Sequence, residues 1–104
     1  MTGRPAAFCY GSGHVVMHGN PAFIETFGPR AVGLPARETL VELPGAAFEL
    51  MDAVLASGKP LATWLHRADG DWRLTVAPRI DPETRETYGV TFHLRARSDV
   101  PIVA

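Results

Sequence analysis

The chain has 104 residues, of which 46% are hydrophobic and 20% are charged, with ten Lys and Arg against eleven Asp and Glu. This length and composition leave room for one soluble domain with one core, and they exclude a disordered protein. The net charge of −1 gives no electrostatic attraction to nucleic acid or to anionic lipid, so we expect neither as a partner.

Two further classes of protein are not expected from the sequence. No apolar run approaches the length that crosses a bilayer, and residues 1–5 carry no hydrophobic signal segment, so we expect a cytoplasmic protein. The single Cys9 has no second cysteine for an internal disulfide. Together with four scattered histidines it shows no zinc-ligand spacing, so no metal site is expected.

Extended segments and short helices alternate along the chain. Apolar runs and alternating patterns bounded by turn residues predict strands at residues 6–10, 14–18, 61–67, 72–80 and 87–97. Polar residues at 68–71 and 81–86 predict hairpin turns between the last three strands. Two strands, several short helices and three hairpin-linked strands make an α+β domain with one antiparallel sheet.

The first predicted helix lies between Asn20 and Gly28. The Asn20 side chain can cap the first turn, and Pro21 fits the first helical position, where an N–H would have no partner in any case. Gly28 allows the backbone to end the helix. Phe23 and Phe27 lie four residues apart on one face, so that face must enter a core.

Two later helical segments are predicted before the third strand. One covers residues 35–40 and is short, because the prolines between positions 29 and 44 prevent a long helix. The other covers residues 46–57 and ends at a glycine closely followed by a proline. Its apolar positions repeat at helical spacing, as expected of a helix packed on a sheet: Phe48, Met51, Val54 and Leu55.

Several short motifs follow one another in a fixed order. A strand runs into Asn-Pro-Ala-Phe-Ile-Glu-Thr-Phe-Gly at 20–28, and Val-Gly-Leu-Pro follows at 32–35. Val-Leu-Ala-Ser-Gly-Lys-Pro at 54–60, Trp-Arg-Leu-Thr-Val-Ala-Pro at 72–78 and a last strand through Tyr-Gly-Val at 88–90 come later. This set, over about residues 6–99, resembles the PAS domains, which are small sensory and interaction modules of signalling proteins. The resemblance implies a single PAS-like domain over residues 1–104, with five antiparallel strands in the order 2-1-5-4-3, short helices on one face and a cavity between the two layers.

A cavity between the helices and the sheet would suit a small, mostly apolar ligand, or it would be filled by its own side chains. Its apolar candidates are Phe23, Phe27, Met51, Leu55, Leu74 and Val76. The resemblance to flavin-binding PAS domains adds Thr91 and His93, on the last strand, as polar groups directed at a bound molecule. Both registers of that strand stay open, because a shift of one residue would turn Thr91 and His93 to the other face.

The register that turns Thr91 and His93 inward exposes an apolar row on the sheet. That row consists of Tyr88, Val90, Phe92 and Leu94, and it is large enough to attract a partner. The resemblance implies a homodimer through this surface. Trp64 would add an aromatic anchor to it, and a core position for Trp64 stays equally open.

The cofactor motifs of the family are missing from the matching segments. Photosensory flavin-binding members carry a reactive cysteine in the helical middle of the domain, and residues 35–43 contain none, so a flavin photoadduct is not expected. Haem-binding members place the iron-ligating histidine on the central helix, and residues 46–57 contain no histidine, so haem held from that helix is not expected either. The cofactor, if there is one, stays unknown.

We therefore expect a noncatalytic sensory and interaction module in signal transduction, which acts on a separate signalling protein. The alternative is a small cone-shaped α+β enzyme, which would need an Asp and a His facing each other in its pocket. Asp52 and His93 are the pair that the sequence offers. His14 and His18 share one side of the second strand, which fits either a metal pair or two solvent-exposed strand ends.

Overall fold

A five-stranded antiparallel sheet forms the centre of the structure, a computed structural model in which residues 4–67 and 70–97 are described. Its strand order is β2-β1-β5-β4-β3, which confirms the predicted order. The strands are β1 (Ala6–Tyr10), β2 (Val15–Gly19), β3 (Leu61–Arg67), β4 (Gly70–Ile80) and β5 (Thr87–Ala96). The predicted turn between β3 and β4 includes residues 68 and 69, which lie outside the described residues.

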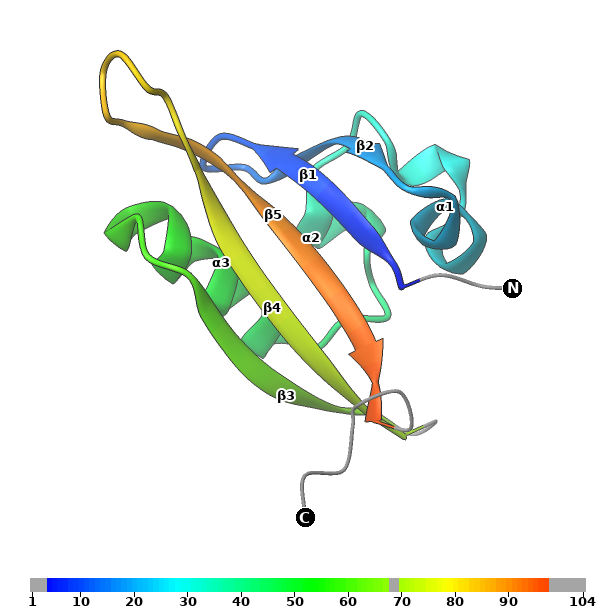
Figure 1. The fold of residues 1–104 in the computed structure, drawn as a ribbon. Coiled ribbons are helices and arrows are strands. Elements are labelled where there is room, and N and C mark those ends of the chain that lie inside the picture. Colours follow the sequence, from blue (N-terminus) through cyan, green and yellow to red (C-terminus); the bar gives the residue numbers. More distant parts are fainter. Residues whose placement is uncertain (1–3, 68–69, 98–104) are drawn as a thin grey trace.

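Short helices cover one face of the sheet and leave the other face open (Figure 1). The helices are α1 (Pro21–Phe27), the 3-10 turn η1 (Pro29–Ala31), α2 (Ala36–Thr39) and α3 (Gly45–Ser57). α3 packs across β3, β4 and β5, behind the sheet in the view of Figure 1. The predicted α+β class is thereby confirmed. Among the described helices, none has the length and apolar character that crossing a membrane requires. The two sides of the sheet are called the covered face and the open face below.

Asn20 joins the beginning of α1 to the first strand. Its Oδ1 accepts a hydrogen bond from the N–H of Phe23 at 2.8 Å, which is the predicted N-cap, and a second from the N–H of Ala6 at 3.1 Å. Its Nδ2 donates to the carbonyl oxygen of Arg4 at 2.8 Å. One side-chain amide therefore satisfies backbone groups of both a helix and a strand.

The core lies between the helices and the covered face. It is one cluster of apolar side chains contributed by α1, α3 and the strands. Its fully buried large members include Phe23, Met51, Val54, Leu65, Leu74, Val76 and Phe92. The ring of Phe23 lies 5.0 Å from that of Phe27 and 6.0 Å from that of Phe92, centroid to centroid. The helical spacing in α1 and α3 and the alternation in β4 thus predicted the buried sides correctly.

The register of β5, the central strand, decides what each face of the sheet carries. Val90, Phe92 and Leu94 point toward the helices and have no exposed surface. Thr91 and His93 point the other way, and His93 is exposed. This corrects the prediction that Thr91 and His93 line the inner cavity. The apolar row is buried because far more apolar surface leaves water in this register than in the other.

Substitutions on the two sides of β5 should therefore differ sharply. Phe92→Ala removes a fully buried ring and should lower the free energy of unfolding by about 3–5 kcal/mol. His93→Ala, on the next residue, should change it by less than about 0.5 kcal/mol because that side chain is exposed. Urea denaturation followed by circular dichroism measures both values. Equal losses in the two variants would contradict the register.

Candidate functional site

Six of the eight predicted cavity residues lie together on the covered face. They are Phe23, Met51, Leu74 and Val76, which are buried, and Phe27 and Leu55, which pack against them and are partly buried. A ligand held between the helices and the sheet would contact these side chains. Thr91 and His93 are separated from them by the sheet itself, since they lie on its other face.

The apolar patch predicted as a homodimer surface is not on the surface. Three of its four members are buried in the core, and Tyr88 is the exception. The pairing of β5 with β4 shifts between Arg79 and Ile80, which leaves Tyr88 as an extra residue. Such a bulge turns a side chain to the opposite face. The Tyr88 ring accordingly lies 6.0 Å from that of Phe8 and 6.4 Å from that of Tyr10.

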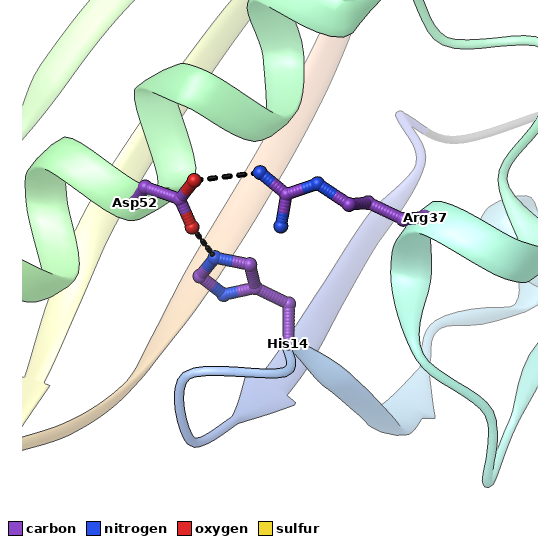
Figure 2. A network of polar contacts seen from close by, with 3 residues as sticks. All are labelled: His14, Arg37 and Asp52. Atoms are coloured by element: carbon purple, nitrogen blue, oxygen red, sulfur yellow. Dashed lines mark hydrogen bonds and ion pairs between the residues drawn. The ribbon is translucent and has the colours of Figure 1, made fainter.

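Three charged or titratable side chains meet where the covering helices contact the turn before β2 (Figure 2). His14, in that turn, is fully buried, and its Nε2 lies 2.6 Å from Oδ1 of Asp52 on α3. Nη2 of Arg37, on α2, donates to Oδ2 of the same carboxylate at 2.6 Å. The carbonyl oxygen of His14 also accepts a hydrogen bond from the N–H of Ala36 at 2.9 Å. The network therefore fastens the turn, α2 and α3 to one another.

The geometry of the network is that of a structural joint between three elements. Asp52 accepts at both oxygens, so His14 donates from Nε2 and is held in one tautomer. Its Nδ1 is enclosed and has no hydrogen-bond partner among the described residues. The backbone of His14 has a φ of 49°, in the left-handed region that is uncommon for residues other than glycine, and the network holds it there.

The predicted pairing of Asp52 with His93 is wrong, because the two residues lie on opposite sides of the sheet. The partner of Asp52 is His14, thirty-eight residues earlier. His14 and His18 are separated as well, since His14 is buried under α3 and His18 is exposed beside Phe8. One signal in the sequence pointed to Asp52: it lies one turn after Phe48, at the edge of the buried stripe of its helix. Its partner could not be inferred without the tertiary structure.

Two ionisable groups have shifted pKa values with clear causes. The hydrogen bond from Arg37, together with that from His14, lowers the pKa of Asp52 below its ordinary 3.8, although partial burial acts in the opposite direction. Burial raises the pKa of the Cys9 thiol to about 12. At neutral pH this thiol is protonated and enclosed in the core, so it is a poor nucleophile.

Among the described residues, no group of three or more His, Cys, Asp or Glu is placed to hold a metal ion.

The open face carries aromatic rings with arginines stacked on them. Arg73 and Arg97 lie over the ring of Trp64, with guanidinium carbons 5.4 Å and 5.3 Å from its centroid. Arg79 lies over the ring of Phe8 at 5.2 Å. Trp64 therefore belongs to the open face and not to the core.

The charge of the open face is set by its arginines. Asp71 is the one acidic residue in the five strands, and it pairs with His66 and Arg97. The face is basic, although the whole chain has a net charge of −1.

A pocket of about 200 Å³ opens on the same face, at its β2 end. Its walls include Phe8, His18, Asn20, Arg79 and Thr91. The ring of Phe8 can lie there because Gly89 has no side chain: a Cβ at that position would come within 2.8 Å of the ring. A second, larger hollow of about 560 Å³ lies between the end of α3 and the β4–β5 hairpin. These two hollows are separate from the six core residues named above, except that Leu55 borders the second.

Several known structures have the same arrangement of elements as this chain. A sensory box sensor histidine kinase from Vibrio cholerae has a TM-score of 0.74 and 13% identity, over 90% of this chain and 78% of that one. The PAS domain of histidine kinase ThkA has a TM-score of 0.70 and 13% identity, over 88% and 98% of the two chains. The chain has the PAS fold. The Vibrio cholerae VqmA–ligand–DNA complex has a TM-score of 0.72 and 17% identity, over 98% of this chain and 49% of VqmA. No protein-family model matches this sequence, and no curated protein matches it.

The pH dependence of the stability of this chain should reveal the contribution of the His14–Asp52–Arg37 network. The pKa of Asp52 is lowered in the folded state, so the charged carboxylate stabilises the fold above about pH 4, and this contribution is lost as the pH falls through the folded-state pKa. Asp52→Asn should therefore cost about 1 kcal/mol near neutral pH, a discounted value because the side chain is half exposed, and progressively less below pH 4.

Glu49→Gln is the matched control, because it removes one carboxylate from an exposed position of the same helix. It should change the free energy of unfolding by less than about 0.5 kcal/mol at neutral pH. Urea denaturation at a series of pH values measures both variants. A loss in Glu49→Gln as large as that in Asp52→Asn would show that the network contributes nothing specific.

Proposed function

We propose that the protein is a noncatalytic sensory and interaction module of signal transduction, which passes its state to another polypeptide through the open face of its sheet. Support for the sensory part comes from the fold, which this chain shares with domains of sensor histidine kinases. A fold does not determine a function, so the proposal has to be argued from the surface of this chain. An enzyme is not favoured, because His14, the histidine paired with Asp52, has no exposed surface.

The single observation that carries the proposal is the composition of the open face. Arginine and aromatic side chains are enriched at the energetic centres of protein interfaces, and here they are stacked on one another in advance. Among the described residues, neither Arg73 nor Arg79 has a carboxylate partner. A partner with an acidic surface would supply the missing carboxylates.

The same charge argues against contact between two copies through this face. In a two-fold dimer through this face, two copies of the same basic surface would be brought together. Like charges that face each other oppose association. An acidic partner is therefore favoured over the homodimer predicted from the sequence, because three of the four apolar residues predicted to form its interface are buried in the core.

The sensory part of the proposal places a small, mostly apolar ligand on the covered face. The side chains available to it are those of Phe23, Phe27, Met51, Leu55, Leu74 and Val76, which come from α1, α3 and β4. A ligand enclosed there would contact both the helices and the sheet. Its presence would then affect the open face, because β4 and β5 carry side chains on both faces of the sheet.

Binding of an acidic peptide should depend on where the positive charges lie. An oligo-glutamate peptide should bind the protein with an affinity that falls as salt is added, because exposed charges are screened within about 10 Å at 0.1 M salt. The double variant Arg73→Gln, Arg79→Gln should lose most of this affinity in fluorescence anisotropy. Arg30→Gln, Lys59→Gln changes the net charge equally on exposed residues away from the open face and should bind almost as well as the wild type. Equal losses in the two doubles would reject the open face as the docking surface.

Native mass spectrometry of the purified protein should show single copies, some of them carrying a small molecule. The first expectation follows from the repulsion between the arginines of two open faces, and the second from the proposed ligand among the core residues. Met51→Ala, which enlarges that region, should change the amount of small molecule retained. A dimer that persists at high salt would favour the homodimer instead.

A further inference from the structure

The pocket on the open face is lined, among the described residues, by hydrogen-bond donors and by no acid. Arg79 holds its guanidinium over the Phe8 ring and has no carboxylate partner among the described residues. The hydroxyl of Thr91 is enclosed and also lacks a hydrogen-bond partner there. A buried hydroxyl without a partner is unusual and calls for an explanation. Both unsatisfied groups can donate to an incoming oxygen.

The side chain of Asn20, which lines this pocket, already has its hydrogen bonds. Oδ1 of Asn20 accepts from the N–H groups of Ala6 and Phe23, and its Nδ2 donates to the carbonyl oxygen of Arg4. No Asp or Glu is among the lining residues in the part of the chain that the structure describes. The remaining described lining consists of the Arg79 guanidinium, the Thr91 hydroxyl, the His18 imidazole, the ring of Phe8 and the small residues Ala6, Ala7 and Gly19. A ligand that matches these walls has an anionic head and an apolar body.

We propose that this pocket binds a small organic monocarboxylate. Its carboxylate would accept hydrogen bonds from the guanidinium of Arg79 and the hydroxyl of Thr91, and its apolar body would lie along the ring of Phe8. Arginine suits this role because its planar fork matches a carboxylate with two parallel hydrogen bonds. The volume of about 200 Å³ is below the range of pockets for drug-sized ligands, about 300–1,000 Å³, so the acid is a short one.

This site goes beyond the proposed function, because it lies on the outer surface and not among the core residues. Its occupant would cover Phe8 and Arg79, two of the residues proposed to meet a partner. Binding of the acid and docking of a partner at that end of the face would therefore exclude each other. The two ideas can fail separately, since the acid is tested by direct binding to the chain alone.

Benzoate is a suitable probe, with benzamide as a neutral molecule of the same shape. In an NMR titration of the ¹⁵N-labelled full chain, benzoate should give saturating shifts that centre on the amides of Phe8, Gly19 and Thr91. Benzamide should give none that saturate, because it lacks the charge. Inorganic phosphate shares the anionic head without the apolar body and should bind more weakly than benzoate. A stronger response to phosphate, or equal responses to benzoate and benzamide, would overturn the proposal.

Variants then assign the binding to the two donors. Arg79→Gln should weaken benzoate binding about tenfold, since it removes a hydrogen bond between charged groups. Thr91→Val should weaken it severalfold, while Thr91→Ser, which keeps the hydroxyl, should retain it. Arg73→Gln is the matched control, because Arg73 also lies over an aromatic ring on this face but does not line the pocket. Equal losses in Arg73→Gln and Arg79→Gln, or no benzoate shifts in the wild type, would reject the site.

Discussion

The burial of the apolar row on β5 is the constraint on which the rest of the structure depends. β5 pairs with β1 on one side and β4 on the other, so its register fixes which residues of both neighbours face the helices. With Val90, Phe92 and Leu94 inward, Cys9 and Val76 are inward too, and the core closes over them. The same register brings Phe8 and Thr91 together on the outside. The inner core and the outer pocket are therefore two consequences of one strand position.

Polar contacts then hold the helical layer in place on that sheet. Asn20 ties α1 to the start of β1, and Asp52 ties α3 to both α2 and the turn that contains His14. Helices as short as α2, with four residues, are not stable by themselves, so contacts of this kind fix their positions. The ring of His14 is fully enclosed, and its contacts connect three elements: the turn before β2, α2 and α3.

The fold limits the functions to be considered but does not by itself determine which one this chain has. The three similar structures share 13–17% identity with this chain, so the likeness concerns the path of the backbone. The side chains of the open face are a property of this sequence. Aromatic rings covered by arginines, in a sheet whose strands contain a single acidic residue, make the open face suited to acidic groups. The proposed function therefore depends on the side chains of that surface, and the fold supports it.

The sequence by itself determined the elements, their order and most of the core, because the cap at Asn20, the spacing in residues 46–57 and the alternation in residues 72–80 are local patterns. It also indicated the PAS architecture through the order of its motifs. It left the two faces of the last strand undecided, since alternation tells which residues share a face and not which face is buried. The pairing of Asp52 with His14, the bulge at Tyr88 and the meeting of Phe8, Arg79 and Thr91 were decided by the tertiary structure alone. These residues are far apart in the chain, and the packing of the sheet against its helices is what brings them together.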